Sequence, residues 1–297
     1  MEQPPEHLEI PEDLREHILA CERCVIMLIG GSDTGKTTLA ERLADALAAS
    51  GIVAIVDTDT GQSRIGPPTT IGWGIVTGGF PGWDAIETEG FYFVGATSPV
   101  RSVESAVVGA KLMCDAARSS ARFVIVDTTG LVTGSLGCTL KWRKINALKP
   151  DVLVAIQRSD ELEPLLERYK RASRPKIFRM KTPGDVHRKT FDQRTAYREQ
   201  LFARYFANSR IVQLPDETVA VRCTDEVYPY DLESLSDRVV SLRDAAGRDL
   251  ALGILLEPDL EDEPFLVRTP LQNVQDVRTV VIGDLRISPD GKQLESL

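Results

Sequence analysis

The sequence predicts an α/β protein in which a doubly wound parallel sheet is followed by a small C-terminal β domain. From residue 25 to about residue 206, short apolar runs alternate with segments of helical periodicity, which is typical of parallel sheets. A glycine-rich turn separates the first apolar run from the helical segment after it. From about residue 208 the pattern changes to short alternating runs between turn residues, which favours a compact β domain.

Length and composition are those of a globular protein with more than one domain. We divide the 297 residues into an N-terminal helical extension at 1–22, a main domain at 23–207 and the β domain at 208–297. No apolar run is long enough to span a bilayer and the N-terminal segment is acidic, so we expect a cytoplasmic protein without a membrane segment. The odd number of cysteines, five, suggests reduced thiols.

One stretch fits a phosphate-binding pattern at every required position: Gly30-Gly31-Ser32-Asp33-Thr34-Gly35-Lys36-Thr37-Thr38. A buried-type strand at residues 25–29 precedes it, and Leu39, Leu43 and Leu47 recur at helical spacing after it. The backbone N–H groups of such a turn and the helix N-terminus bind phosphate together. The stretch therefore predicts the triphosphate site of a P-loop NTPase, with Lys36 on the β- and γ-phosphates and the Thr37 hydroxyl on Mg²⁺.

The next strand, predicted at residues 52–56, ends in carboxylates. Asp57 and Asp59 follow it, and Gln62 lies three residues further along. Ligands of open α/β sheets bind at the carboxyl ends of the strands, next to such a loop. An acid there can hold Mg²⁺ or accept a proton from an attacking hydroxyl. We therefore predict both roles for Asp57; the alternative is two aspartates that only end a strand in a turn.

The remaining elements continue the alternation. Residues 63–83 are rich in glycine and proline, so we expect a long ordered loop with at most a short strand. Further strands are predicted at residues 91–96, 123–126, 152–156 and 176–178, and helices at 11–21, 103–118, 136–148, 161–169 and 188–206. Asp127 follows the strand at 123–126, in the position of a second acid. In the β domain, strands are predicted at 211–214, 218–222, 239–243, 250–256, 265–267 and 277–285, with turns at 215–216, 246–247, 258–259 and 290–291.

A basic segment interrupts an otherwise acidic chain. Residues 168–210 carry thirteen Lys and Arg against three acids, a net +10 in a chain whose formal charge is −9. This indicates a local polyanion site, with a solvated helical face as the alternative. Arg194 and Arg198 are four residues apart on a predicted helix, so they project from one face. Above the P-loop they can form a lid, at about residues 168–206, that neutralises charge on a transferred phosphoryl group.

Several motifs, in this order, resemble the polynucleotide 5'-hydroxyl kinases: Asp57-Thr58-Asp59-Thr60-Gly61-Gln62-Ser63 with Gly66-Pro67-Pro68, Gly95-Ala96-Thr97-Ser98-Pro99, Asp127-Thr128-Thr129-Gly130-Leu131-Val132-Thr133-Gly134, and Arg194-x-x-x-Arg198 ahead of Tyr205-Phe206. That family includes the kinase subunit of the pre-mRNA cleavage machinery and the nucleolar ribosomal-RNA processing kinase. The resemblance extends from about residue 25 to the C-terminus, and the chain looks like a compact prokaryotic-type member.

The resemblance implies transfer of the γ-phosphate of ATP, or of another NTP, to the 5'-hydroxyl of RNA or DNA, in RNA processing or nucleic-acid repair. Its cofactors are then an NTP and Mg²⁺, and its partner is single-stranded or end-exposed RNA or DNA. Carried over by position, Lys36, Asp57, Arg194 and Arg198 are catalytic, residues 30–38 bind the triphosphate, and Thr37 with Asp57 holds the metal. The acceptor strand would contact Asp59, Gln62, Thr128, Thr129, Gly130 and Leu131.

Leu131 departs from the family pattern. Members that act on RNA often carry a tryptophan at this position, on which the terminal base stacks. Stacking of a base on an aromatic ring is worth about 1 to 3 kcal/mol, so Trp73, Trp83 or Phe80 would have to supply it. The alternative function is an ATP-binding scaffold or regulatory protein of RNA processing with little or no turnover. A small-molecule kinase is disfavoured, because thirteen cations in one segment exceed what a small acceptor needs. Preference for RNA or DNA and for the NTP, protein partners, oligomeric state and pathway stay open.

Overall fold

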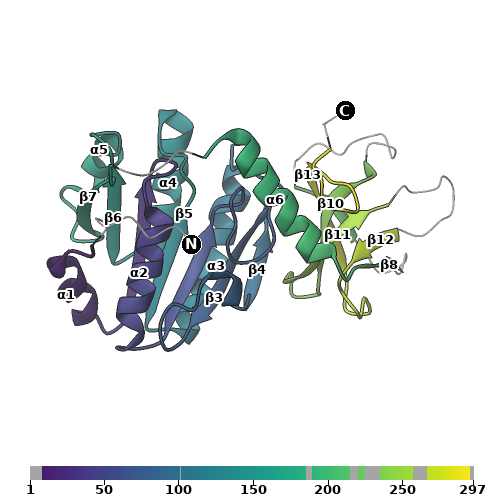
Figure 1. The fold of residues 1–297 in the computed structure, drawn as a ribbon, viewed down its shortest axis with the longest axis horizontal. Helices are drawn as coiled ribbons and strands as arrows, with labels where there is room; N and C mark the ends of the chain where they lie inside the picture. Colours follow the sequence, from purple (N-terminus) through teal and green to yellow (C-terminus); the bar gives the residue numbers. More distant parts are fainter. Residues whose placement is uncertain are drawn as a thin grey trace.

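The computed structural model describes residues 9–100, 102–184, 189–214, 220–224, 235–256 and 266–294. Within these residues the chain forms two sheets with a long helix between them (Figure 1). The expectations for residue 188, for the turns at 215–216 and 258–259, and for the starts of the strands at 218 and 265 fall outside the described residues.

The first sheet is mostly parallel, with the order β4-β3-β2-β5-β1-β6-β7. Its strands are β1 (Cys24–Gly30), β2 (Val53–Thr58), β3 (Thr70–Val76), β4 (Gly90–Phe93), β5 (Phe123–Thr128), β6 (Val152–Gln157) and β7 (Lys176–Lys181). Strands β1, β2, β5 and β6 are buried along their whole length, as expected for continuous apolar runs covered on both faces. The pairs β2–β3 and β3–β4 are antiparallel, and the other neighbouring strands of this sheet pair parallel.

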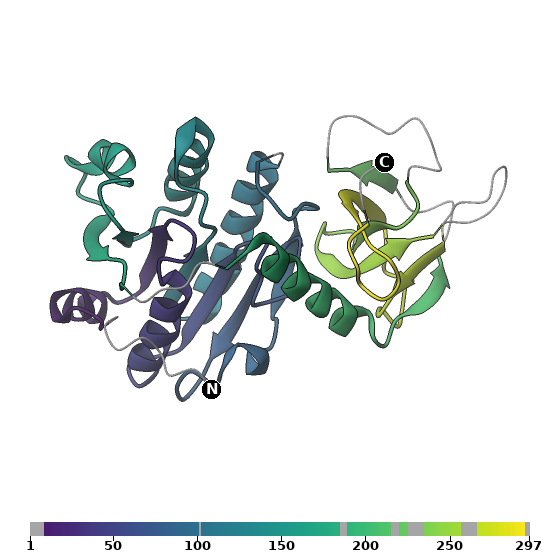
Figure 2. The ribbon, with the colours of Figure 1, turned by 45° about the horizontal axis from the view of Figure 1, so that its top comes forward.

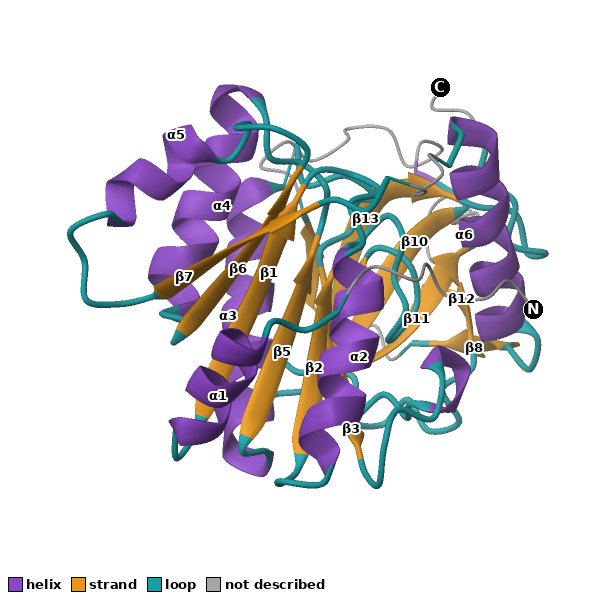
Figure 3. Ribbon diagram, turned by 60° about the vertical axis from the view of Figure 1, so that its left-hand side comes forward, coloured by secondary structure: helices purple, strands orange, loops and turns teal. Residues whose placement is uncertain are grey.

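Helices cover both faces of this sheet (Figure 3). One face packs on α1 (Glu12–Ala20) and α2 (Lys36–Ala48) around Leu14, Leu39 and Leu43. The other face packs on α3 (Val103–Ser120), α4 (Gly134–Leu148) and α5 (Glu163–Leu166), which is followed by the short turn η2 (Glu167–Tyr169). The predicted doubly wound sheet is confirmed.

Strand β3 is longer than the sequence predicted. A seven-residue strand lies within the segment expected to be mainly loop. A Cβ atom at Gly72 would lie 2.1 Å from the carbonyl oxygen of Ile65, and one at Gly74 would lie 2.4 Å from that of Glu87. The glycines that suggested a loop therefore let two loop segments pass close to the strand. A short 3-10 turn, η1 (Trp83–Ala85), lies in the connection to β4.

The second sheet contains β8 (Arg210–Gln213), β9 (Ala220–Cys223), β10 (Arg238–Arg243), β11 (Asp249–Leu255), β12 (Leu266–Thr269) and β13 (Thr279–Arg286). Their order is β8-β12-β11-β10-β13-β9, and all neighbours pair antiparallel except β13 and β9. These six strands lie in the segments where the sequence predicts strands.

Helix α6 (Phe191–Phe206) runs between the two sheets (Figures 1 and 2). It begins with a capping box, in which the Thr190 hydroxyl accepts from the Gln193 N–H and the Gln193 side chain accepts from the Thr190 N–H. Its C-terminal half packs Phe202 and Phe206 in a core shared with Phe93 of the first sheet and with several residues of the second sheet. Among the described residues, no helix is both long and apolar enough to cross a membrane.

Candidate active site

The phosphate-binding loop is shaped by its glycines and by Asp33. Gly35 precedes α2 with φ +93°, and Asp33 has φ +53°, a left-handed conformation that Asp tolerates better than most residues. A Cβ atom at Gly30 would lie 2.5 Å from the carbonyl oxygen of Ile156. The loop therefore turns sharply between β1 and α2, and this turn brings the N-terminus of α2 to the carboxyl edge of the sheet.

Lys36 begins α2 and is buried. Its Nζ donates a hydrogen bond of 2.6 Å to the carbonyl oxygen of Gly31, within its own loop. Burial lowers the pKa of the Lys36 ammonium, and the nearby carboxylates of Asp127 and Asp59 oppose this shift. The lysine thus lies folded over the loop, where it can exchange the Gly31 carbonyl for phosphate oxygens.

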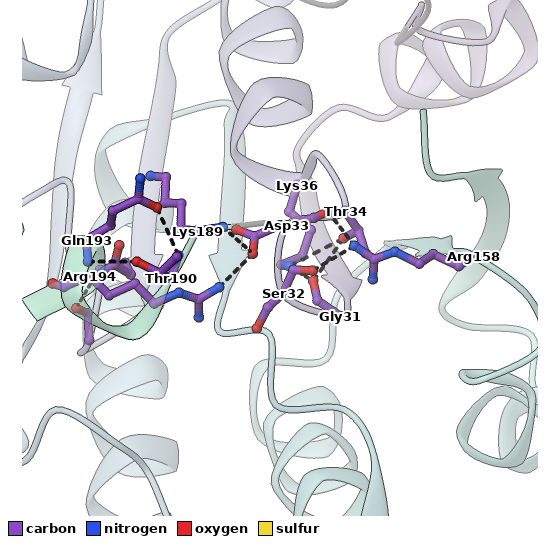
Figure 4. Close-up of polar contacts among 12 residues, drawn as sticks. Gly31, Ser32, Asp33, Thr34, Lys36, Arg158, Lys189, Thr190, Gln193 and Arg194 are labelled. Atoms are coloured by element: carbon purple, nitrogen blue, oxygen red, sulfur yellow. Dashed lines mark hydrogen bonds and ion pairs between the residues drawn. The ribbon is translucent and has the colours of Figure 1, made fainter. Parts of the chain in front are cut away.

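Two guanidiniums from distant elements contact the loop (Figure 4). Arg158, which follows β6, donates to the carbonyl oxygens of Ser32 and Asp33 at 3.0 and 2.6 Å. Arg194 of α6 forms an ion pair of 2.6 Å with the Asp33 carboxylate, which also accepts from the Lys189 N–H at 3.3 Å. The N-terminal part of α6, within the predicted lid at about residues 168–206, is therefore attached to the phosphate-binding loop through Asp33.

Asp127 lies directly against the predicted metal-binding hydroxyl. Thr37 Oγ1 donates to Asp127 Oδ2 at 2.7 Å. Burial raises the pKa of the Asp127 carboxyl, and the charge of Lys36 opposes this shift. A hydroxyl beside a carboxylate is a pair of oxygen donors of the kind Mg²⁺ prefers, so these residues fit the cation. The sequence analysis placed Asp127 after an apolar strand, in the position of a second acid, but did not predict it as a metal ligand. Asp57 follows a neighbouring apolar strand in the same way, and this similarity could have indicated a metal-binding role for Asp127.

Asp57 lies opposite Asp127 on the neighbouring strand, in register across β2 and β5. Its carboxylate is 2% exposed and accepts from the backbone N–H groups of Asp59, Arg64 and Ile65. Burial raises the pKa of the Asp57 carboxyl to about 8, and the negative charges of Asp127 and Asp59 add to the shift. Thr37 contacts Asp127 rather than Asp57, so the role of Asp57 as a metal ligand stays a prediction.

These groups line one cavity of about 260 Å³, called here the phosphate cavity. It is lined by residues 32–38 of the loop together with Asp57, Asp59, Gln62, Arg64, Asp127, Thr128, Gly130, Lys189 and Arg194. Four cationic and four acidic side chains therefore face the space where a triphosphate would meet an acceptor. Arg64 and Lys189 are the two cations that the sequence reasoning did not single out.

A second cavity of about 260 Å³ adjoins the phosphate cavity and is called here the Leu131 cavity. Both lid arginines line it, as their four-residue spacing predicts, together with the predicted acceptor residues Asp59, Gln62, Thr129, Gly130 and Leu131. Arg198 donates to Thr195 Oγ1 and Gln293 Oε1, both at 2.9 Å. The Nε atoms of Arg194 and Arg198 have no hydrogen-bond partner among the described residues. Both guanidiniums therefore retain a donor for a ligand.

The loop after β5 is held tightly from two sides. A Cβ atom at Gly130 would lie 2.3 Å from Ser32 Oγ, so only glycine allows this approach to the phosphate-binding loop. Thr128, predicted to contact the acceptor, instead directs its hydroxyl to the carbonyl oxygen of Leu28 at 2.7 Å. Behind the loop, the fully buried Lys141 of α4 donates to Thr128 Oγ1 and to the carbonyl oxygen of Thr129.

A second buried lysine of α4 lies nearby. Lys144 is fully buried and donates to the carbonyl oxygen of Thr58 at 3.4 Å. Burial lowers the pKa of its ammonium to about 8, opposed by the charges of Asp59 and Asp57. The sequence reasoning missed Lys141 and Lys144, because lysines on a helix usually face solvent. Lys141 and Lys144 are one turn apart, on the same side of the helix as the apolar residues Leu140 and Ile145, and this spacing could have predicted their burial.

None of the three aromatic residues considered for base stacking lies beside Leu131. Among the described residues that line the Leu131 cavity, none is aromatic. Trp73 is 8% exposed within the core of the first sheet. Phe80 and Trp83 pack against each other with ring centroids 5.3 Å apart, and Trp83 Nε1 donates to Glu41 of α2.

The fold and the site together define a P-loop nucleotide-binding protein. Residues 30–208 match the family model described as the P-loop of the mRNA cleavage and polyadenylation factor CLP1. The chain belongs to this family, and the resemblance of its motifs to the polynucleotide 5'-hydroxyl kinases is confirmed.

Relatives are similar over nearly the whole chain. A polyribonucleotide 5'-hydroxyl-kinase of Methanocaldococcus jannaschii is 31% identical, covering 96% of this chain and 94% of that protein. One of Pyrococcus furiosus is 29% identical, covering 96% and 95%. The structure of wild-type Clp1p in complex with Pcf11p has a TM-score of 0.71 at 13% identity, covering 91% of this chain and 76% of that one. The structural likeness bears on the fold alone.

Proposed function

We propose that this protein is an ATP-dependent polynucleotide 5'-hydroxyl kinase, which transfers the γ-phosphate to the 5'-hydroxyl of RNA or DNA. One observation carries the proposal: a single cavity brings together Lys36 of the phosphate-binding loop, the Thr37–Asp127 pair and the buried carboxylate of Asp57. RNA is the acceptor to test first, because relatives that match 96% of the chain are named polyribonucleotide 5'-hydroxyl kinases.

The donor side of the reaction follows from the loop. Its backbone N–H groups and the N-terminus of α2 would hold the triphosphate, and Lys36 would turn from the Gly31 carbonyl to the β- and γ-phosphates. Thr37 and Asp127, with Asp57 as a predicted further ligand, are the residues that would hold Mg²⁺. When bound, the cation would neutralise charge on the phosphates.

The acceptor side centres on Asp57. A carboxylate whose pKa is raised to about 8 is a stronger base than an ordinary aspartate. Its ionised form, which increases as the pH rises toward about 8, can take the proton of a 5'-hydroxyl. Arg194 would move from Asp33 to the transferred phosphoryl group, where its fork of donors stabilises developing charge. Catalysis of phosphoryl transfer depends mainly on positioning the reacting groups and on neutralising their charge.

The test is transfer of labelled γ-phosphate from ATP to a short 5'-hydroxyl RNA and to the DNA of the same sequence. Wild type and Arg15→Ala, which alters an exposed basic residue of α1 outside both cavities, are expected to label the oligonucleotide. Lys36→Ala and Arg198→Ala are expected to lose the label. The ratio of RNA to DNA labelling gives the acceptor preference.

The competing function is an ATP-binding scaffold with little or no turnover. The non-aromatic lining of the Leu131 cavity is the observation that favours it, since the terminal base finds no ring there. If the wild-type protein binds ATP but transfers label to neither the RNA nor the DNA, the scaffold function replaces the kinase proposal.

A further inference from the structure

A groove of about 510 Å³ opens between the η1 segment, the C-terminal half of α6 and the start of β11. It will be called the Trp83 groove. Its volume lies in the range of about 300 to 1,000 Å³ that small-molecule sites occupy. Trp83, Phe91 and Tyr205 supply aromatic surface, and Arg64 and Arg204 supply guanidinium groups. Aromatic rings beside guanidiniums are the combination that binds single-stranded nucleic acid.

Arg64 connects this groove to the phosphate cavity, because it lines both. Its N–H donates to the carboxylate of Asp57. Its guanidinium carbon lies 5.8 Å from the ring centroid of Trp83 and 5.7 Å from that of Tyr197. In the described part of the chain, no carboxylate lies within ion-pair distance of Arg64. Its guanidinium therefore has no ion pair among the described residues, while its backbone N–H stays in contact with Asp57.

Two acids of the groove are already neutralised. Asp84 forms an ion pair of 2.8 Å with Arg204, and Asp249 forms one of 2.7 Å with Arg243. The Oδ2 atom of Asp249 also accepts from the Phe93 N–H at 3.0 Å. Glu89 is a third acid, which leaves the groove without strong positive charge away from Arg64. The groove thus suits a base and its sugar, while the phosphate belongs at Arg64.

We propose that Arg64 and the Trp83 groove bind the second nucleotide of the acceptor strand. The proposal rests on the proposed kinase function. With the terminal 5'-oxygen at Asp57 and the terminal base on the side of Leu131, the next phosphate falls at Arg64 and the second base stacks beside Trp83. The N-terminal half of α6 then contacts the first nucleotide through Arg194 and Arg198, and the C-terminal half contacts the second.

A nucleotide in the groove could come from the acceptor strand or from the base of the NTP donor. Kinetics of the intact enzyme separate these sources. Two acceptors are compared. A nucleoside 3'-phosphate has the phosphate that would contact Arg64 but lacks a second base, whereas an oligonucleotide has both. We expect wild type to have a higher kcat/KM with the oligonucleotide, by about tenfold, as one stacked base allows.

Trp83→Leu is expected to remove most of this advantage, while the KM for ATP stays as in wild type. Arg64→Gln is expected to raise the KM of both acceptors, because both place a phosphate at Arg64. Trp142→Leu is the matched control, since Trp142 is 38% exposed on α4 and its ring stacks under Arg168, outside both cavities and the groove. This control is expected to keep the wild-type ratio between the two acceptors.

Binding gives a readout that needs no turnover. Oligonucleotides with 2-aminopurine at the second or at the fourth position report stacking, because an aromatic contact quenches this base. We expect quenching by wild type at the second position only, and its loss in Trp83→Leu. Phe91→Leu, which alters another aromatic residue that lines the groove, serves where Trp83→Leu does not fold.

Three results overturn the inference. The first is equal kcat/KM for the two acceptors in wild type, and the second is a 2-aminopurine signal unchanged by either groove variant. The third is a raised KM for ATP in Trp83→Leu with the acceptor ratio intact, which would assign the groove to the donor base. Wild type that phosphorylates no acceptor of any length would instead contradict the proposed function.

Discussion

At the scale of single residues, the site depends on two buried aspartates on adjacent strands. Asp57 and Asp127 lie in register, but their partners differ. Asp127 accepts from the Thr37 hydroxyl, whereas Asp57 accepts only from backbone N–H groups among the hydrogen bonds of the described residues. The first environment suits a metal ligand and the second suits a group that takes up a proton.

The Thr37–Asp127 pair makes Asp127→Asn a test of the metal site. The amide keeps the shape but removes the charge that would hold Mg²⁺. We expect the Mg²⁺ concentration for half-maximal transfer to rise by at least about tenfold, the effect seen even for groups that only support metal ligands. The measurement is the initial rate of transfer against Mg²⁺ at saturating ATP. An unchanged half-saturation would remove Asp127 from the metal site.

The raised pKa of Asp57 predicts a pH-dependent stability. Its pKa is about 8 in the folded protein against an ordinary 3.8, so between these values the folded state binds the extra proton. The stability due to Asp57 is therefore full below about pH 4 and is lost as the pH rises through about 8.

Asp57→Asn lacks this titration, so its free energy of unfolding should rise relative to wild type as the pH increases from about 4 to about 8. Urea unfolding of both proteins in metal-free buffer measures the difference. A difference that stays constant with pH would show that Asp57 ionises normally in the folded protein.

At the scale of elements, α6 links chemistry at one end to packing at the other. Its N-terminus contacts Asp33 of the phosphate-binding loop, and its C-terminus lies in the core shared by the two sheets. A basic amphipathic helix could have been only a solvated surface. In the structure its buried side carries Arg198, Phe202 and Phe206, and the helix is held at both ends.

The attachment of α6 predicts that Arg194→Ala lowers turnover far more than stability. Guanidiniums that stabilise a transferred phosphoryl group contribute about 10³ to 10⁵ in kcat. The Arg194–Asp33 pair, with Arg194 29% exposed, should contribute less than about 1 kcal/mol to folding. Single-turnover rates and thermal unfolding of wild type, Arg194→Ala and Arg194→Lys distinguish the two effects. A kcat within threefold of wild type would show that the lid does not act through Arg194.

At the scale of the whole molecule, the two sheets share one core. Phe93 of the first sheet, Phe202 and Phe206 of α6, and Leu252 and Ile254 of the second sheet pack together. The Phe93 N–H also donates to Asp249 of β11. We therefore expect the two sheets to unfold in one cooperative transition.

Phe202→Ala tests this shared core. Removing a fully buried phenylalanine should lower the free energy of unfolding by about 3 to 5 kcal/mol. Phe191→Ala is the matched control on the same helix, because Phe191 is 77% exposed and should change stability little. Calorimetry should show one transition in wild type. Two separate transitions in wild type would show instead that the sheets fold independently.

Features that depend on neighbouring residues in the chain could be predicted before the structure was known. The phosphate-binding loop needs glycines and a following helix, the buried strands need continuous apolar runs, and the spacing of Arg194 and Arg198 puts them on one side of α6. These are consequences of local backbone geometry and periodicity, so the strands, the helices and the loop could be predicted. The glycines of β3 led to a wrong prediction of a loop. They are required because other segments of the chain pass close to the strand, which local sequence does not reveal.

Which functional groups come into contact depends on how the elements pack together. Asp127 reaches Thr37 across 90 residues of sequence, Arg194 reaches Asp33 across 161, and Lys141 is buried behind the loop after β5. Arg64 had no predicted role, and Trp83 was one of three candidate rings for stacking the terminal base. The packing of α6 and β11 places both residues in the wall of a groove. The burial of a side chain and its charged partners depend on elements that are far away in the sequence. Local sequence patterns do not show which of these elements lie close to it in the folded protein.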